Sequence, residues 1–225
     1  MDIRKIAGAT GAACLMLSGC GIGDAGAVPT HGPVRYGKAA PSGHVPINAS
    51  GRQVVPAGEW PDACGLLSDK EIRALLPQAG GIRRQYQQSI ADEPFISARP
   101  GAPDSTFTAP HGGCVFSFAI PRGAGTLAVA IHGVGGPGLV RRAYAERLKS
   151  AREDDHPRRV SAQAGPQTCF RESPQTSNVE CRQGPILFGT SGSGVAAGAG
   201  TSADLDAWTT HAVIPAAATI AAKIA

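Results

Sequence analysis

Cysteine residues constrain the fold of this 225-residue chain more than any other residue type. Two of the six lie near the N-terminus, Cys14 inside a short apolar run and Cys20 at its end. The other four are spread through the remainder of the chain, at Cys64, Cys114, Cys169 and Cys181. An even set of this kind predicts two disulfides if the chain reaches an oxidising compartment.

The N-terminus has the form of a secretory signal. Two basic residues precede an apolar run over 6–17, which is shorter than the roughly 20 residues needed to span a bilayer. The segment Leu17-Ser18-Gly19-Cys20 resembles the lipobox after which signal peptidase II cuts bacterial lipoproteins. We therefore predict a signal peptide over 1–19, and a diacylglyceryl group and an N-acyl chain such as palmitate on Cys20. The open alternative is an ordinary secretory signal that is cut elsewhere.

Residues 20–59 predict a flexible tether. They are rich in Gly, Pro, Ala and Ser and contain few large apolar side chains, so burial cannot offset the entropy lost on ordering. The folded part is then one domain over residues 60–225, long enough for a sizeable core. The C-terminal stretch 213–225 is apolar but short and contains Pro215, and it predicts a docked helix rather than a membrane span.

The charge balance does not indicate a nucleic acid as a partner. The formal net charge is +4, and it falls to +3 without residues 1–19, because Asp2, Arg4 and Lys5 carry +1 between them. That value is modest for a domain of this size.

Four cysteines permit three pairings. We favour Cys64 with Cys114, which would tie the opening helix to the first strong strand, and Cys169 with Cys181, which would frame a short polar loop. The alternative is a zinc site, but the chain contains no Cys-x-x-Cys, and His111-Gly-Gly-Cys114 is a lone half-motif. We predict no metal site.

The first half of the domain predicts a helix, a loop and a hairpin. Ser68 and Glu71 form a capping box before an apolar helix face that Pro77 ends. The stretch 80–113 is polar and contains several prolines, which predicts a long irregular loop. Apolar residues then alternate over 114–120 and 127–131, which predicts two paired strands.

The second half repeats this order. An apolar stripe of Val140, Tyr144, Leu148 and Ala151 predicts an amphipathic helix over 139–153. Residues 178–182 and 186–190 predict a second hairpin, 158–164 an edge strand, and 201–224 a helix that Pro215 kinks or splits. The expected fold is a single α+β domain, an antiparallel sheet with helices packed on one face and two disulfides.

The segment Trp60-Pro61-Asp62-Ala63-Cys64-Gly65-Leu66-Leu67-Ser68, followed by Glu71, resembles the opening of a family of uncharacterised actinobacterial lipoproteins with a domain of unknown function. The later Gly113-Cys114-Val115-Phe116 resembles the family's second cysteine before a strand, although the family has Asp-Pro-Cys where this chain has Pro-Asp-Ala-Cys. The resemblance implies an exported lipoprotein and no active-site residue. The two-disulfide plan is also distantly similar to the extracellular sensor domains of mycobacterial receptor kinases, as a fold-level analogy.

Two motifs imitate known enzyme sites. Gly133, Gly135 and Gly138 have the GxGxxG spacing of a dinucleotide fingerprint, but the strand before them is predicted to lie in a hairpin and no further βα units follow. We therefore expect a tight strand-to-helix turn. Residues 189–193 miss the GxSxG nucleophile elbow because Ser193 replaces the last glycine, and the glycine-rich sequence after them predicts a flexible loop.

The remaining polar residues specify no catalytic or metal constellation. The histidines His111, His132, His156 and His211 have no Ser and acid partners at a defined spacing. Asp154 and Asp155 lie among arginines, which predicts a solvated charge cluster rather than a calcium site. We predict no catalytic residue and no cofactor.

These expectations leave three classes of function. The first is a non-enzymatic lipoprotein, anchored at Cys20 to the extracytoplasmic face of the cell membrane, that binds an unknown ligand or an envelope protein. The second is an envelope hydrolase of unrecognised type. The third is a structural or assembly accessory lipoprotein.

Overall fold

The computed structural model describes residues 32–49, 53–121, 123–154, 157–160, 168–196 and 202–224. Their strands are β1 (Gly80–Ile90), β2 (Thr108–Ile120), β3 (Gly123–Val134), β4 (Arg158–Arg159), β5 (Thr168–Arg171), β6 (Val179–Gln183) and β7 (Ile186–Ala196). Their α-helices are α1 (Asp69–Leu75), α2 (Glu93–Ser97), α3 (Pro137–Asp154), α5 (Ser202–Trp208) and α6 (Ile214–Ile224). Short 3-10 turns are η1 (Ala57–Glu59), η2 (Ala63–Gly65) and η3 (Asp104–Thr106), and a π-helical turn, η4 (Thr209–Val213), joins α5 to α6. The predicted lipid site Cys20, the signal peptide 1–19, and Asp155 and His156 lie outside the described residues.

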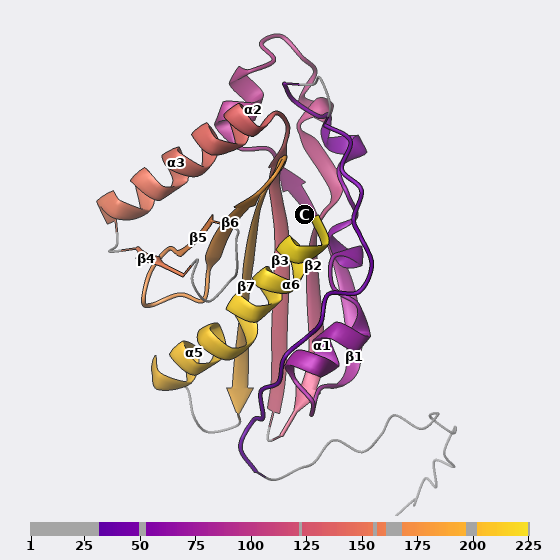
Figure 1. Cartoon of the computed structure of the whole chain (residues 1–225), viewed down its shortest axis with the longest axis vertical. Coiled ribbons are helices and arrows are strands. Elements are labelled where there is room, and N and C mark those ends of the chain that lie inside the picture. Colours follow the sequence, from indigo (N-terminus) through magenta and orange to yellow (C-terminus); the bar gives the residue numbers. More distant parts are fainter. Residues whose placement is uncertain are drawn as a thin grey trace, which may run out of the picture.

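The strands form one antiparallel sheet in the order β1-β2-β3-β7-β6-β5-β4 (Figure 1). The α+β class is therefore confirmed. Helices α1, α5 and α6 cover one face, as expected. Helix α3 lies on the opposite face, because it packs on Phe170 and Leu187, whereas their chain neighbours Cys169 and Phe188 belong to the core under α6.

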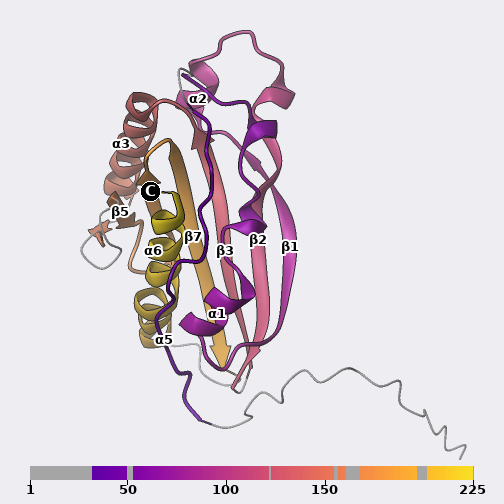
Figure 2. The ribbon, with the colours of Figure 1, turned by 45° about the vertical axis from the view of Figure 1, so that its right-hand side comes forward.

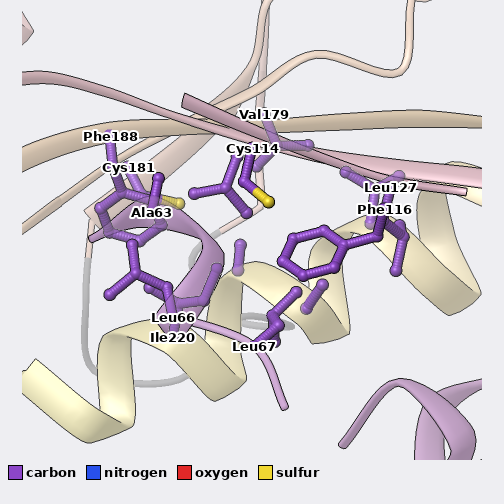
Figure 3. Packing of buried hydrophobic residues seen from close by; sticks show 14 of the residues in the cluster. Ala63, Leu66, Leu67, Cys114, Phe116, Leu127, Val179, Cys181, Phe188 and Ile220 are labelled. Atoms are coloured by element: carbon purple, nitrogen blue, oxygen red, sulfur yellow. The ribbon is translucent and has the colours of Figure 1, made fainter. Parts of the chain in front are cut away.

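The two predicted hairpins form the centre of this sheet. Strands β2 and β3 pair from Gly113 with Ala130 to Ile120 with Gly123, and β6 pairs with β7. Alternate residues of each strand enter the main core, where Phe116, Leu127 and Phe188 point toward the helix that carries Ile220 (Figure 3). Burial of these side chains supplies the main driving force for joining sheet and helices.

Both predicted disulfides are present. Cys64–Cys114 joins η2 to β2 across 50 residues of sequence. Cys169–Cys181 joins β5 to β6 at a pair of residues that face each other in the sheet. The capping box of α1 is present as well, with Glu71 N–H donating to the Ser68 hydroxyl and Ser68 N–H donating to the Glu71 carboxylate.

The prediction of an irregular loop over 80–113 is wrong at both ends. Residues 108–113 belong to strand β2. Residues Gly80–Ile90 form the edge strand β1, which pairs with β2. Most side chains of this strand are exposed, and an edge strand with few buried residues shows no apolar alternation from which it could be predicted. Main-chain pairing to β2 decides its conformation.

Residues 189–193 also differ from prediction, because they continue strand β7 rather than form a loop. Added side chains at Gly192 and Gly194 would overlap with the backbone of Thr126 and the ring of Trp208, respectively. The glycines therefore permit Trp208 to lie close against the strand. Their role here is to allow close packing, and they do not make the segment a flexible loop.

The C-terminal helix is continuous through Pro215. The π-helical turn η4 comes directly before it, and the Pro215 carbonyl accepts a hydrogen bond from the Thr219 hydroxyl. A π turn relieves the loss of a backbone donor at proline, so the helix is neither split nor ended there.

The predicted tether differs most from the structure. Residues 32–49 lie in extended form along the domain, beside α1 and α6 (Figure 2). Gly37 N–H donates to the Leu75 carbonyl and Val45 N–H to the Lys223 carbonyl, and Tyr36 packs on the ring of Trp208. Within the described residues the folded part therefore begins well before residue 60. The reason is that scattered apolar side chains of this segment pack against the main core.

Candidate functional site

Two of the three dinucleotide-like glycines, Gly133 and Gly135, are sites of close packing. A side chain at Gly133 would overlap with the Phe95 ring, and one at Gly135 would overlap with the Gln53 carbonyl. The preceding strand β3 is antiparallel to both of its neighbours, whereas a dinucleotide site needs a parallel strand and its crossover helix. The three glycines belong to no cofactor site of this kind.

The serines of the elbow-like segment form no hydrogen bond with a histidine within the described residues. The Ser193 hydroxyl is 3.2 Å from the Thr126 hydroxyl. Ser191 faces Ala128 and lines a hollow of about 160 Å³ together with His132, but the ring nitrogens of His132 lie toward Arg147 and Glu180. His111 and His211 contact the rings of Tyr86 and Tyr36.

A cluster around Arg147 unites polar side chains from distant parts of the chain. Its guanidinium donates two hydrogen bonds to the Asp92 carboxylate, with Nε 2.5 Å from Oδ2 and Nη2 2.9 Å from Oδ1. It also lies 3.2 Å from Glu180 Oε1 and 3.8 Å from Glu172 Oε1. We call Asp92, His132, Arg147, Glu172 and Glu180 the arginine cluster. It joins α3 to the segment before α2 and to strands β3 and β6.

His132 occupies the inner side of the arginine cluster. Its Nδ1 lies 2.9 Å from Arg147 Nη2, and its Nε2 lies 3.3 Å from Glu180 Oε2. Because a guanidinium can only donate, Nδ1 accepts and the ring proton sits on Nε2, facing Glu180. Gly189 makes room for this pair, since a side chain there would lie 2.6 Å from Glu180 Oε1 and 2.8 Å from His132 Nε2.

The charges of the cluster hold one another ionised. Burial alone would raise the pKa of Glu180, but the hydrogen bond from His132 and the positive charge of Arg147 outweigh burial and lower the pKa. Burial would also lower the pKa of Arg147, yet the hydrogen bonds to Asp92 and the nearby carboxylates raise it. The guanidinium is therefore a permanent charge.

A hollow of about 540 Å³ opens beside this cluster, between α2, α3 and the turn that joins β5 to β6. We call it the acidic hollow, and its polar lining includes Asp92, Glu93, Glu146, Arg147, Glu172 and Thr176. The lining thus contains four carboxylates and one guanidinium, which is itself engaged by Asp92. The Thr176 hydroxyl is shielded from solvent and has no hydrogen-bond partner in the described structure.

The lining of the acidic hollow indicates which kind of ligand would fit there. The hydroxyls on the wall, Ser150, Ser173 and Thr176, have no histidine in hydrogen-bond reach among the interactions of the described residues, and the basic nitrogen of His132 is turned toward Arg147. No group of three or more His, Cys, Asp or Glu side chains within the described ranges could hold a metal ion. Carboxylates on a hollow surface suit a ligand that brings positive charge and hydrogen-bond donors.

The arginine cluster was not predicted from the sequence, although a signal for it exists. Arg147 lies seven residues after Val140 and four before Ala151, on the apolar stripe of its helix. A charged residue in an apolar pattern indicates a buried partner, but the pattern does not say which one. Glu180 gives no such signal, because a polar residue that alternates with the core residues Val179 and Cys181 in a strand is also the pattern of a solvent-facing position.

Comparison with known proteins finds no matching family model, curated protein or solved structure. Among the described residues, no helix is both long enough and apolar enough to cross a membrane.

Proposed function

We propose that this protein is an exported lipoprotein, anchored through Cys20 to the outer side of the cell membrane, that binds a positively charged ligand or a basic part of an envelope protein at the acidic hollow. The proposed activity is binding without chemical conversion. The anchor rests on the lipobox-like Leu17-Ser18-Gly19-Cys20, and two disulfides suit an oxidising compartment.

One observation carries the binding proposal: the lining of the acidic hollow is negatively charged, whereas the chain as a whole is positively charged. The chain as a whole carries a formal net charge of +4, yet the hollow presents Asp92, Glu93, Glu146 and Glu172 against a single Arg147. A concave surface with one sign of charge raises the local concentration of oppositely charged ligands. The arginine cluster holds the wall rigid, so little ordering entropy is lost on binding.

The anchor predicts the fate of a Cys20→Ala variant. Without the thiol no lipid can be attached, and we expect the protein to leave the membrane fraction and appear in the culture medium. Fractionation and immunoblotting of the producing bacterium measure this, with the unaltered chain as the control. If the variant stays in the membrane fraction, the anchor at Cys20 is wrong.

The acidic hollow predicts binding of a small dication. We propose titrating the soluble Cys20→Ala variant, labelled with ¹⁵N, with agmatine, which carries a guanidinium and an ammonium group. Amide shifts should gather around Glu93, Glu146 and Glu172, and Glu146→Gln should weaken binding by about threefold, the effect of one partly screened charge.

The matched control for this titration is Glu153→Gln. Glu153 lies on the same helix but outside the hollow, where it is exposed and pairs with the exposed Lys149. Equal affinities of the Glu146 and Glu153 variants would contradict the assignment of the hollow as the binding site.

A further inference from the structure

A second concave site lies where the family-like segment Trp60-Pro61-Asp62 meets strands β1 and β2. It is a cleft of about 230 Å³. We call it the aromatic cleft, and its side walls are Trp60, Pro61, Asp62, Tyr86, Pro110 and His111. The rest of the same segment has structural roles, because Cys64 forms a disulfide, Leu66 and Leu67 enter the core and Ser68 caps α1. Trp60, Pro61 and Asp62 are the part of the segment that faces the cleft.

The aromatic walls of the cleft are held in place. Tyr86 is 50% exposed. Among the described residues, Tyr86 and Ile90 are the two large hydrophobic side chains that are exposed. The Tyr86 hydroxyl donates to Asp62 Oδ2 at 3.2 Å, and its ring meets the His111 ring edge to face, with centroids 4.6 Å apart. The Trp60 indole N–H donates to the Val55 carbonyl at 3.0 Å. Three rings are thereby fixed around the opening before any ligand arrives.

The charge at the cleft is negative. Asp62 accepts hydrogen bonds from Cys64 N–H and from Tyr86, which orient its carboxylate but leave its charge in place. The guanidinium of Arg84, which is also on β1, is engaged elsewhere, because it binds Asp69 at 2.5 Å and lies over the Phe116 ring. The charge of Asp62 raises the pKa of Tyr86 despite the opposing effect of Arg84. Ring faces and a carboxylate together attract a cation that has an apolar shell.

We propose that the aromatic cleft binds a quaternary ammonium group, such as the trimethylammonium of choline. The cleft is smaller than the sites that hold drug-sized ligands, which begin near 300 Å³, so it suits one compact head group rather than an extended chain. Such a group gains cation–π attraction from the rings and Coulomb attraction from Asp62, while its methyl groups demand no hydrogen bonds. The source of the group is either a free solute or a lipid head group.

Tryptophan fluorescence tests this proposal directly. The chain has two tryptophans, of which Trp60 lines the cleft and Trp208 is buried in the core. Titration of the soluble Cys20→Ala variant with tetramethylammonium chloride, at constant ionic strength, should give a saturable change with a dissociation constant on the order of millimolar. Ammonium chloride is the matched salt and should give no saturation. Sedimentation with phosphatidylcholine vesicles then separates a lipid source from free choline.

Three variants locate the site. Tyr86→Ala should weaken tetramethylammonium binding by about fivefold, and Asp62→Asn should weaken it by about threefold while still capping Cys64 N–H through its amide oxygen. Ile90→Ala, also on β1 but outside the cleft, should bind as the parent does. Circular dichroism confirms that each variant is folded.

A linear response, equal saturation by ammonium, or unchanged affinity in both Tyr86→Ala and Asp62→Asn would overturn the proposal. Saturation by a polyproline peptide or an oligosaccharide in place of tetramethylammonium would overturn it as well. The aromatic cleft and the acidic hollow share no lining residue, so this titration and the agmatine titration fail or succeed independently.

Discussion

At the scale of single residues, Glu71 is the most heavily bonded side chain of the described structure's polar core. It is 1% exposed and accepts hydrogen bonds from the backbone and hydroxyl groups of Ser42 and Ser68. Lys223, 4% exposed, donates to it at 3.1 Å and to the Leu66 carbonyl at 2.9 Å. A buried ion pair is tolerated when its remaining lone pairs and protons are satisfied in this way.

Glu71 predicts a loss of stability in acid. Burial alone would raise its pKa, but the hydrogen bonds from Ser68 and Ser42 outweigh burial and lower the pKa from 4.5 to about 2. Because the folded-state pKa is the lower one, the contribution of Glu71 is complete above pH 4.5 and is lost as the pH falls toward 2. Glu71→Gln should reduce the free energy of unfolding by about 3 kcal/mol at pH 7, since Lys223 then lacks its counter-charge.

Urea denaturation at pH 7, 4.5 and 2.5 measures this difference. The gap between the parent and Glu71→Gln should narrow as the pH falls, because the carboxylate becomes protonated in the unfolded parent, with a pKa of 4.5, before it does so in the folded parent. A gap that does not change with pH would contradict the role of the carboxylate charge. The exposed Glu153→Gln serves as the control.

At the scale of elements, the segment 32–49 acts as an added strip of structure across α1 and α6. Its main chain bonds to residues near the ends of both helices, and its apolar side chains Val34, Tyr36, Val45 and Ile47 pack on the main core. The segment has no regular secondary structure of its own. Its conformation is decided by the helices that it covers.

This arrangement predicts that Tyr36→Ala destabilises the domain. Tyr36 packs edge-on against Trp208, with centroids 6.3 Å apart, and lies 5.1 Å from the His211 ring. Loss of this partly buried ring should reduce the free energy of unfolding by about 1 to 2 kcal/mol. Urea denaturation of the soluble chain measures the change. His44→Ala, in an exposed part of the same segment, should leave stability unaltered, and equal stability of both variants would mean that the segment does not hold to the domain.

At the scale of the whole molecule, one disulfide supports the sheet on the side of β1 and β2, and the other supports it on the side of β5 and β6. Cys64–Cys114 ties the chain before α1 to β2, and Cys169–Cys181 ties β5 to β6. The aromatic cleft lies at the β1–β2 side and the acidic hollow near β5 and β6. Each proposed site therefore rests on a part of the sheet that a disulfide supports, which is one route to a preorganised binding surface.

Local patterns in the sequence predict much of this fold. The capping box at Ser68 and Glu71, the two hairpins, the amphipathic helix of Val140 and Tyr144, and both disulfides all follow from signals within a few residues of each other or from cysteine spacing. Caps and alternation are visible in sequence because they arise from hydrogen bonds and burial that repeat with the period of the element.

The tertiary structure alone decided the rest. Strand β1 and the strip 32–49 take their form from surfaces built by other segments, and β7 continues through its glycines because it pairs with β3 along its length. The arginine cluster joins Asp92, His132, Arg147 and Glu180 from four separate segments. The sequence by itself determined the segments whose apolar period or caps are visible locally, which are helices α1 and α3, the two hairpins and the disulfide-forming cysteines. Which polar side chains meet depends on contacts between residues far apart in the chain, and no local period records those contacts.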